Sequence, residues 1–120
     1  MKRTHEMIVI VVLCAVVLGT ALVAHAADAE QGKKLYGQFC ATCHGQSGKG
    51  DGAAAAALNP KPRDHTDKEY MSKLSDDDML KVIKNGGASV GKSPLMPPWG
   101  ASLKDDQIQD IIAYVRTLSK

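Results

Sequence analysis

The chain has 120 residues, of which 23% are charged, and its formal net charge is +2 at pH 7. So nearly neutral a balance excludes the strongly basic surface that is typical of nucleic-acid-binding domains. The length predicts one domain near the small end of the range, where an ordinary apolar core is marginal.

Residues 1–26 are typical of a secretory signal. Lys2 and Arg3 precede an apolar run over residues 7–23, and an Ala-His-Ala triplet at 24–26 ends it with the small-x-small pattern of a cleavage site. We therefore expect cleavage after Ala26 and an exported domain over 27–120. The apolar run has seventeen residues, which is long for a signal peptide and short for a spanning helix, so an uncleaved membrane anchor is the alternative.

The first helix of the exported part is expected over 30–43. Leu35, Tyr36, Phe39, Cys40 and Cys43 recur there at spacings of three and four, the period of one helix face. The helix leads into a Cys-Ala-Thr-Cys-His segment at 40–44, and Cys-x-x-Cys-His is the peptide to which haem is covalently attached in c-type cytochromes. Each cysteine sulfur can close a thioether onto a haem vinyl group, and the adjacent histidine then lies beneath the iron as an axial ligand.

Other interpretations of this segment carry less support. A thioredoxin-like redox site expects a preceding strand in a βαβ context, which the flanking GKKLYGQF does not resemble. A structural zinc site needs four ligands, and His65 stands alone downstream of the two cysteines. A chance match is rare in a chain with so few cysteines and histidines.

The rest of the chain alternates loops with short helices. Four glycines predict a loop over 45–52, and the alanine run at 53–57 is expected to begin as loop and end in a turn. A short helix over 67–73, with Thr66 as its candidate cap, precedes a clear helix that begins after Ser75 and stops at Asn85-Gly86-Gly87. The last helix is expected over 105–118, with Gln109, Asp110 and Arg116 on its polar side. No strand pattern is found, so the predicted fold is all-α.

The chain resembles the class I monohaem c-type cytochromes, particularly small bacterial carriers and cytochrome-c-like oxidase subunits. The resemblance covers about residues 29–119. It rests on Gly32-x-x-x-Tyr36, the segments CATCHGQSGKGDG at 40–52 and Leu-Asn-Pro-x-Pro at 58–62, Met-Pro-Pro-Trp-Gly at 96–100, and a closing helix that ends Tyr-Val-Arg-Thr-Leu. It implies a cytochrome c fold of short helices around one haem c attached through Cys40 and Cys43.

The resemblance also implies the other site residues. Met96, in a late proline-rich loop, is expected to be the second axial ligand beside His44. Met71 and Met79 are the competing methionines, and their helical spacing predicts core packing. By resemblance the carbonyl of Pro60, with Pro62 as the alternative, accepts a hydrogen bond from the far nitrogen of His44.

Three further side chains lie near these motifs. Arg63 and Trp99 are the candidates for hydrogen bonds to the haem propionates. His65 is interpreted as a surface loop residue, because Met96 better matches the ligand position. Gly32 and Tyr114 resemble the pair at which the first and last helices of the family cross.

These observations predict a periplasmic cytochrome that carries single electrons between redox-protein partners. No nucleic acid or small-molecule substrate is expected, since no Ser/His/acid set, phosphate loop or paired carboxylate is found. We expect a monomer whose only membrane contact is an uncleaved N-terminal segment, if one is retained. One alternative is a fixed subunit of a respiratory complex in the inner membrane; another, if Met96 is not a ligand, is a gas-binding or peroxide-reducing haem protein.

Overall fold

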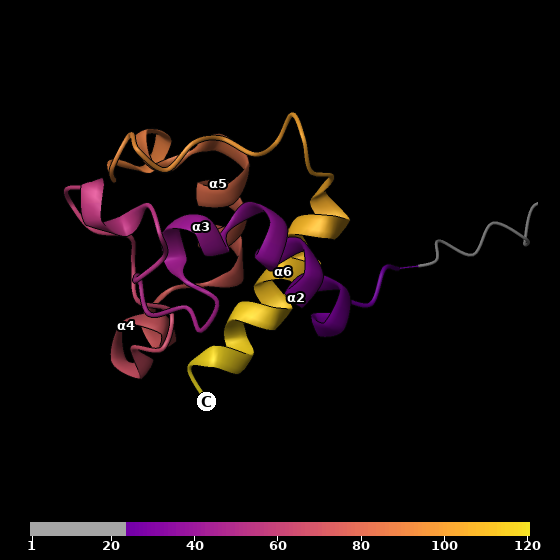
Figure 1. Cartoon of the computed structure of the whole chain (residues 1–120). Helices are drawn as coiled ribbons and strands as arrows, with labels where there is room; N and C mark the ends of the chain where they lie inside the picture. Colours follow the sequence, from indigo (N-terminus) through magenta and orange to yellow (C-terminus); the bar gives the residue numbers. More distant parts are fainter. Residues whose placement is uncertain (1–23) are drawn as a thin grey trace, which may run out of the picture.

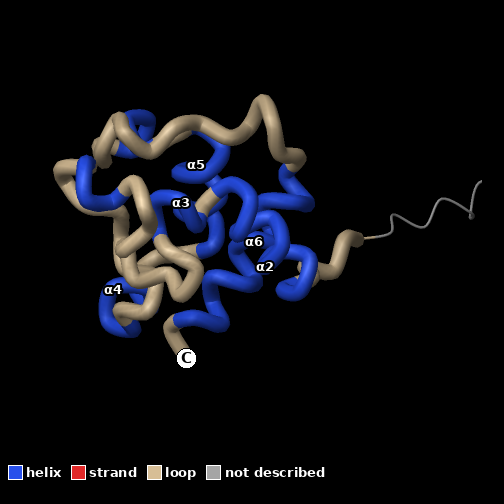
Figure 2. The backbone as a smooth tube through the Cα atoms, viewed as in Figure 1, coloured by secondary structure: helices blue, strands red, loops and turns tan. Residues whose placement is uncertain are grey.

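The computed structural model describes residues 24–120, and every regular element in that range is a helix (Figures 1 and 2). The predicted apolar run at 7–23, on which the choice between signal peptide and anchor depends, lies outside the described residues. In chain order the elements are α2 (Ala29–Phe39), α3 (Ala41–His44), the 3-10 turn η1 (Ala55–Ala57), α4 (Lys68–Lys73), α5 (Asp76–Asn85), the 3-10 turn η2 (Gly87–Val90) and α6 (Asp105–Leu118). The all-α prediction is confirmed. Among residues 24–120, no helix has both the length and the apolar character needed to cross a bilayer.

Helices α2 and α6 cross at the centre of the fold (Figure 1). The crossing is close because Gly32 has no side chain: a Cβ there would lie 1.8 Å from the carbonyl oxygen of Asp110. Around it Tyr36, Ile108 and Ile111 are almost completely buried. Tyr114 does not fill the gap at Gly32 but packs edge-on against Tyr36, with ring centroids 5.2 Å apart. The crossing therefore joins backbone to backbone.

The predicted single helix over 30–43 is interrupted at Cys40. The backbone N–H of Cys40 still donates a hydrogen bond to the carbonyl of Tyr36. Cys40 nevertheless ends α2, and the separate short helix α3 begins after it. The cap of α4 is Asp67, whose carboxylate accepts from the backbone of Tyr70, and not Thr66. Ser75 caps α5 as predicted, accepting from the backbone N–H of Asp78 at 3.1 Å.

Two residues expected on the polar side of α6 are instead structural. The carboxylate of Asp110 is only 4% exposed and accepts from the backbone of Asp28 at 2.8 Å. Arg116 donates to the carbonyls of Met71, at 2.6 Å, and Leu74, and pairs with Asp76 at 2.7 Å. The physical reason is that α6 meets, at its middle and in its last turn, backbone groups of other segments that need hydrogen-bond partners, and these two side chains supply them.

Candidate haem site

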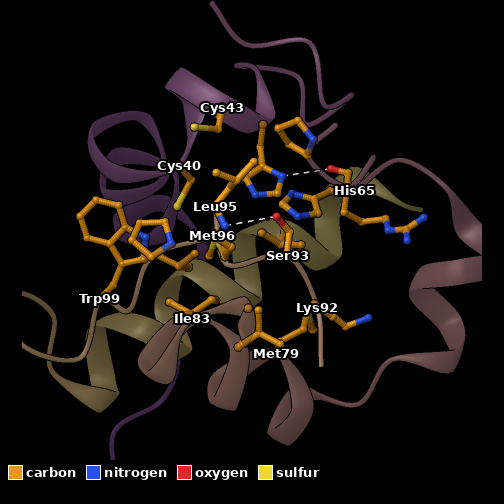
Figure 3. Close-up of a pocket in the computed structure, with 18 of the residues that line it drawn as sticks. Cys40, Cys43, His65, Met79, Ile83, Lys92, Ser93, Leu95, Met96 and Trp99 are labelled. Carbon is orange, nitrogen blue, oxygen red and sulfur yellow. Dashed lines mark hydrogen bonds between the residues drawn. The ribbon is translucent and has the colours of Figure 1, made fainter. Parts of the chain in front are cut away.

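A cavity of about 470 Å³ lies between the α2–α3 corner, α5 and two loops, which contribute residues 58–65 and 92–99 to its wall. Figure 2 draws both loops in tan. Its volume is typical of sites for cofactors and small ligands. All seven residues singled out in the sequence line it: Cys40, Cys43, His44, Pro60, Arg63, Met96 and Trp99. Figure 3 shows the two cysteines on one side of this space and Met79, Ile83 and Lys92 on the other. Tertiary packing thus brings residues spread over 60 positions of chain to one place.

The two cysteines line the cavity as free thiols. Neither is in a disulfide, and Cys40 is buried while Cys43 is half-buried. Burial, followed by the neighbouring Cys43, raises the pKa of the Cys40 thiol to about 12. A thiol used for disulfide exchange needs a lowered pKa so that the reactive thiolate forms. The environment of Cys40 therefore argues against a thioredoxin-like site.

His44 is held in the tautomer that suits a metal ligand. Its Nδ1 lies 3.0 Å from the carbonyl oxygen of Arg63 and donates to it. Burial keeps the pKa of His44 below its ordinary value, against a smaller opposite effect of the Arg63 hydrogen bond, so the ring is neutral at pH 7. With its proton on Nδ1, a neutral imidazole keeps the Nε2 lone pair free for a metal.

The acceptor is Arg63, and the prediction of Pro60 or Pro62 for this hydrogen bond is wrong. The carbonyl of Pro62 faces Gly50 instead, where an added Cβ would lie 2.4 Å from its oxygen. Pro60 is exposed and lines the cavity, but the hydrogen bond from Nδ1 of His44 goes to Arg63. The carbonyl that accepts the hydrogen bond from His44 therefore belongs to the residue after Pro62.

The loop that carries Met96 is tied to the end of α5. The Met96 carbonyl accepts from the backbone of Gly87 at 2.9 Å, and the backbone of Trp99 donates to Ile83 at 2.9 Å. A Cβ at Gly87 would lie 2.1 Å from the carbonyl oxygen of Ser93. The glycines that stop α5 therefore also let this loop pack close to it, which holds the Met96 side chain at the cavity (Figure 3).

The competing methionines lie in the core as predicted. Met71 is 1% exposed and Met79 is 5% exposed, and both belong to the central apolar cluster. Each also forms part of the cavity wall.

Positive charge gathers on part of the cavity rim. Lys61, Arg63 and Lys92 line the cavity, and no acidic side chain is among the described residues that do so. The guanidinium of Arg63 lies over the ring of Tyr70, 3.8 Å from its centroid, and Lys92 donates to the Tyr70 hydroxyl at 2.8 Å. Figure 3 shows Trp99 on the opposite side of the view from Lys92.

The remaining wall is apolar. Trp99 packs edge-on against Phe39, with centroids 5.4 Å apart. Leu58, Leu74, Val82, Ile83 and Leu95 complete much of the surface. Leu95 remains 48% exposed.

This set of groups fits a covalently attached haem. Two free thiols suit the vinyl groups, a neutral histidine and a thioether suit the iron, the apolar wall suits the porphyrin, and the cations suit its carboxylates. A zinc site gains no support, since no three His, Cys, Asp or Glu side chains within 24–120 are placed to hold a metal ion together.

Sequence reasoning missed one member of the site. His65, interpreted as a surface residue, lines the cavity and stacks on His44 with ring centroids 4.3 Å apart. Burial, followed by the proximity of His44, lowers the pKa of His65 to about 3. In the sequence, the only indication of a role at the site was that His65 lies two residues after Arg63. This spacing does not show whether the His65 ring packs inside the fold or faces solvent.

Over residues 27–115 the chain matches the family described as cytochrome C oxidase, cbb3-type, subunit III. The chain belongs to this family of c-type cytochrome domains. It is 32% identical over 93 residues to the cbb3-type cytochrome c oxidase subunit CcoP of Azospirillum brasilense, covering 78% of this chain and 29% of that protein. The chain thus spans less than a third of the CcoP subunit.

Other relatives of this cytochrome are covered nearly end to end. Cytochrome c-554(547) of Halothiobacillus neapolitanus is 32% identical over 97 residues, which are 78% of this chain and 99% of the relative. Cytochrome c6 of Pyropia yezoensis is 30% identical over 104 residues, 87% of this chain and 84% of the relative. The solved structure of the KustC0563 c-type cytochrome superposes with a TM-score of 0.60 at 28% identity, over 74% of this chain and 98% of that one.

These matches establish the family and the cytochrome c fold. The chain carries a c-type cytochrome domain, and the relatives that it covers over most of their length are small cytochromes c. Membership of the family implies haem c as the cofactor.

Proposed function

We propose that this cytochrome is a periplasmic carrier of single electrons. One haem c is attached through Cys40 and Cys43, and His44 and Met96 are its axial ligands. The observation that carries the proposal is that both thiols, the neutral imidazole of His44 and Met96 line one cavity whose described rim is cationic and free of acidic side chains.

The protein's part in electron transfer is to hold these ligands still. The Arg63 carbonyl orients the His44 ring through Nδ1, and hydrogen bonds to α5 anchor the loop that carries Met96. Bound haem supplies the iron centre that is oxidised and reduced by one electron. If His44 and Met96 both hold the iron, they would leave no position open for oxygen or peroxide, and the thioether and the burial would raise the reduction potential relative to two histidines.

The rim cations would bind the carboxylates of the haem. Arg63 and Lys92, which both contact Tyr70, are proposed to hold the haem carboxylates, while the paired rings of Phe39 and Trp99 would supply apolar contacts to the porphyrin. Trp99 remains a candidate donor to a carboxylate, but its contact with Phe39 favours an apolar role.

The partners are proposed to be a redox-protein donor and acceptor. They would dock a monomer near the cavity mouth, where Leu95 is half-exposed. The resemblance to CcoP supports the alternative that the domain works as a fixed part of a membrane-bound respiratory complex.

Visible absorption spectra of the exported protein, oxidised and dithionite-reduced, test the ligand assignment. We expect sharp reduced α and β bands together with the weak charge-transfer band at the red end that reports iron–methionine ligation. Replacement Met96→Ala should abolish that band and leave the haem attached, because the thioethers do not depend on Met96. Met79→Leu is the matched control, since Met79 also lines the cavity, and it should keep the band.

Two results would contradict the proposal. A high-spin spectrum that changes with carbon monoxide would show an open iron position and favour gas binding or peroxide chemistry. A protein without haem absorbance after export would remove the proposal altogether.

A further inference from the structure

His65 occupies a place that its loop position does not predict. Its ring lies nearly parallel to the ring of His44, with centroids 4.3 Å apart and an angle of 17° between the planes. Because the two rings stack face to face, His65 lies beside His44 and does not face it across the cavity. His65 therefore cannot take the axial position opposite His44.

The His65 ring is held firmly from behind. Its backbone N–H donates to the carbonyl of Gly48 at 2.6 Å. Its Nδ1 lies 3.3 Å from the hydroxyl of Tyr36, a residue of the last turn of α2 that is 1% exposed. The ring of Tyr36 is in turn packed against Tyr114 of α6. His65 is thus connected to the closely packed crossing of α2 and α6.

One short segment supplies both contacts to His44. Arg63 provides the carbonyl that accepts from Nδ1, and His65, two residues later, provides the stacked ring. Between them the carboxylate of Asp64 accepts from both the backbone and the hydroxyl of Thr66, each at 2.7 Å. This local turn fixes the carbonyl and the ring relative to each other.

The two contacts restrain different motions of the His44 ring. The hydrogen bond to Arg63 holds one ring atom but allows the imidazole plane to turn about the N–H···O direction. A second ring packed against the face of His44 opposes that turn. Together they determine the rotation of the imidazole plane as well as its tautomer.

We propose that His65 is a positioning residue which sets the orientation of the His44 imidazole plane, with the Tyr36 hydroxyl as its support. This inference rests on the proposed role of His44 as axial ligand. The plane of an axial imidazole determines which iron d orbitals it overlaps. The principal g-values of the oxidised protein, and the pattern of its haem-methyl NMR shifts, therefore report the orientation directly.

The experiment uses the exported, haem-loaded protein and compares His65→Phe, His65→Leu and His65→Ala with wild type. Phenylalanine keeps a flat ring against His44, so we expect g-values and methyl shifts close to wild type. The leucine and alanine variants lose the flat ring, and their g-values should move or broaden and the order or spread of the methyl shifts should change. Tyr36→Phe removes only the supporting hydroxyl and should produce a smaller change of the same kind.

Lys68→Ala is the matched control, since Lys68 is exposed at the start of the neighbouring helix α4, and it should leave both spectra unchanged. Unchanged spectra in the leucine variant, or in the alanine variant, would overturn the inference. If the alanine variant does not fold, the leucine variant, which fills the space, decides alone. Absence of low-spin haem in the wild-type protein would instead show that the proposed function has failed.

Discussion

Gly32 is the residue on which the contact between α2 and α6 depends most directly. The carbonyl oxygen of Asp110 occupies the space where a Cβ would be, at 1.8 Å. That neighbour is helix backbone, which cannot rotate away as a side chain can. Gly37, five residues later in the same helix, has no heavy atom within 4 Å of its added Cβ. The two glycines thus have opposite roles although both lie inside α2.

Replacement Gly32→Ala should lower the free energy of unfolding by about 3 kcal/mol, because the helices must separate to admit the methyl group. Gly37→Ala should leave stability unchanged or raise it by about 0.5–1 kcal/mol, since alanine is the better helix residue. Urea unfolding of the haem-loaded proteins measures both values. Equal effects of the two substitutions would show that the crossing is not as close as the structure has it.

At the scale of elements, the start of α5 combines a cap with an acidic first turn. Ser75 accepts from the backbone of Asp78 at 3.1 Å and donates to its carboxylate at 2.7 Å. The hydrogen bond from Ser75 lowers the pKa of Asp78, and the nearby Lys81 acts in the same direction. Because the folded state binds this proton less readily than the unfolded chain, the pair stabilises α5 above pH of about 4 and less as pH falls through the folded pKa.

Replacement Ser75→Ala should therefore raise the pKa of Asp78 toward its ordinary value, as followed by NMR titration of its carboxyl carbon. Loss of the cap should also destabilise the domain by about 1 kcal/mol. Ser102→Ala, at an exposed serine in the loop before α6, serves as control and should change neither quantity. A pKa of Asp78 that stays low in the Ser75 variant would assign the shift to the lysine instead.

At the scale of the whole molecule, the start of the described chain is attached to the last helix. The buried carboxylate of Asp110 accepts from the backbone of Asp28 and also lies 2.8 Å from Nε2 of His25. The hydrogen bond to Asp110 raises the pKa of His25. Cleavage after Ala26 would remove the contact of His25 but keep the hydrogen bond from Asp28. The residues after the proposed cut therefore still provide a hydrogen-bond partner for the buried carboxylate of Asp110.

N-terminal sequencing of the protein recovered from the periplasm should begin at Ala27. The physical reason is that the small residues at 24 and 26 fit the site at which export signals are cut, and the described residues 24–28 form no helix that would hide it. An intact N-terminus in the membrane fraction would contradict cleavage and support the anchored alternative.

The haem also belongs to the scale of the whole molecule. Apolar side chains such as Leu95 and Val82 line a cavity of about 470 Å³. In so small a domain, a cavity of this size leaves much apolar surface without the packing contacts that a core provides. A cofactor that fills this space supplies the missing apolar contacts. The same group is thus proposed both to complete the core and to carry the electron.

Local chemistry explains how much of the site could be predicted from the sequence. Thioether attachment requires two cysteines at fixed spacing beside a histidine, so Cys40, Cys43 and His44 could be named from five consecutive residues. Helix periods and the Ser75 cap are local in the same sense, and these predictions are confirmed. The break at Cys40 was missed because the apolar period continues through it.

The sequence by itself therefore determined the fold class, the family and the peptide at which haem attachment is proposed. Only the tertiary structure decided that Arg63 supplies the carbonyl acceptor for His44, that His65 stacks on it, and that Asp110 and Arg116 satisfy backbone groups of other elements. Every residue has a carbonyl, so the sequence does not indicate which one accepts the hydrogen bond. A polar side chain is predicted to be exposed unless its neighbours in the fold are known. Which of these groups meet depends on the crossing of α2 and α6 and on the folding of loops over the cavity, and residue type alone carries no trace of either.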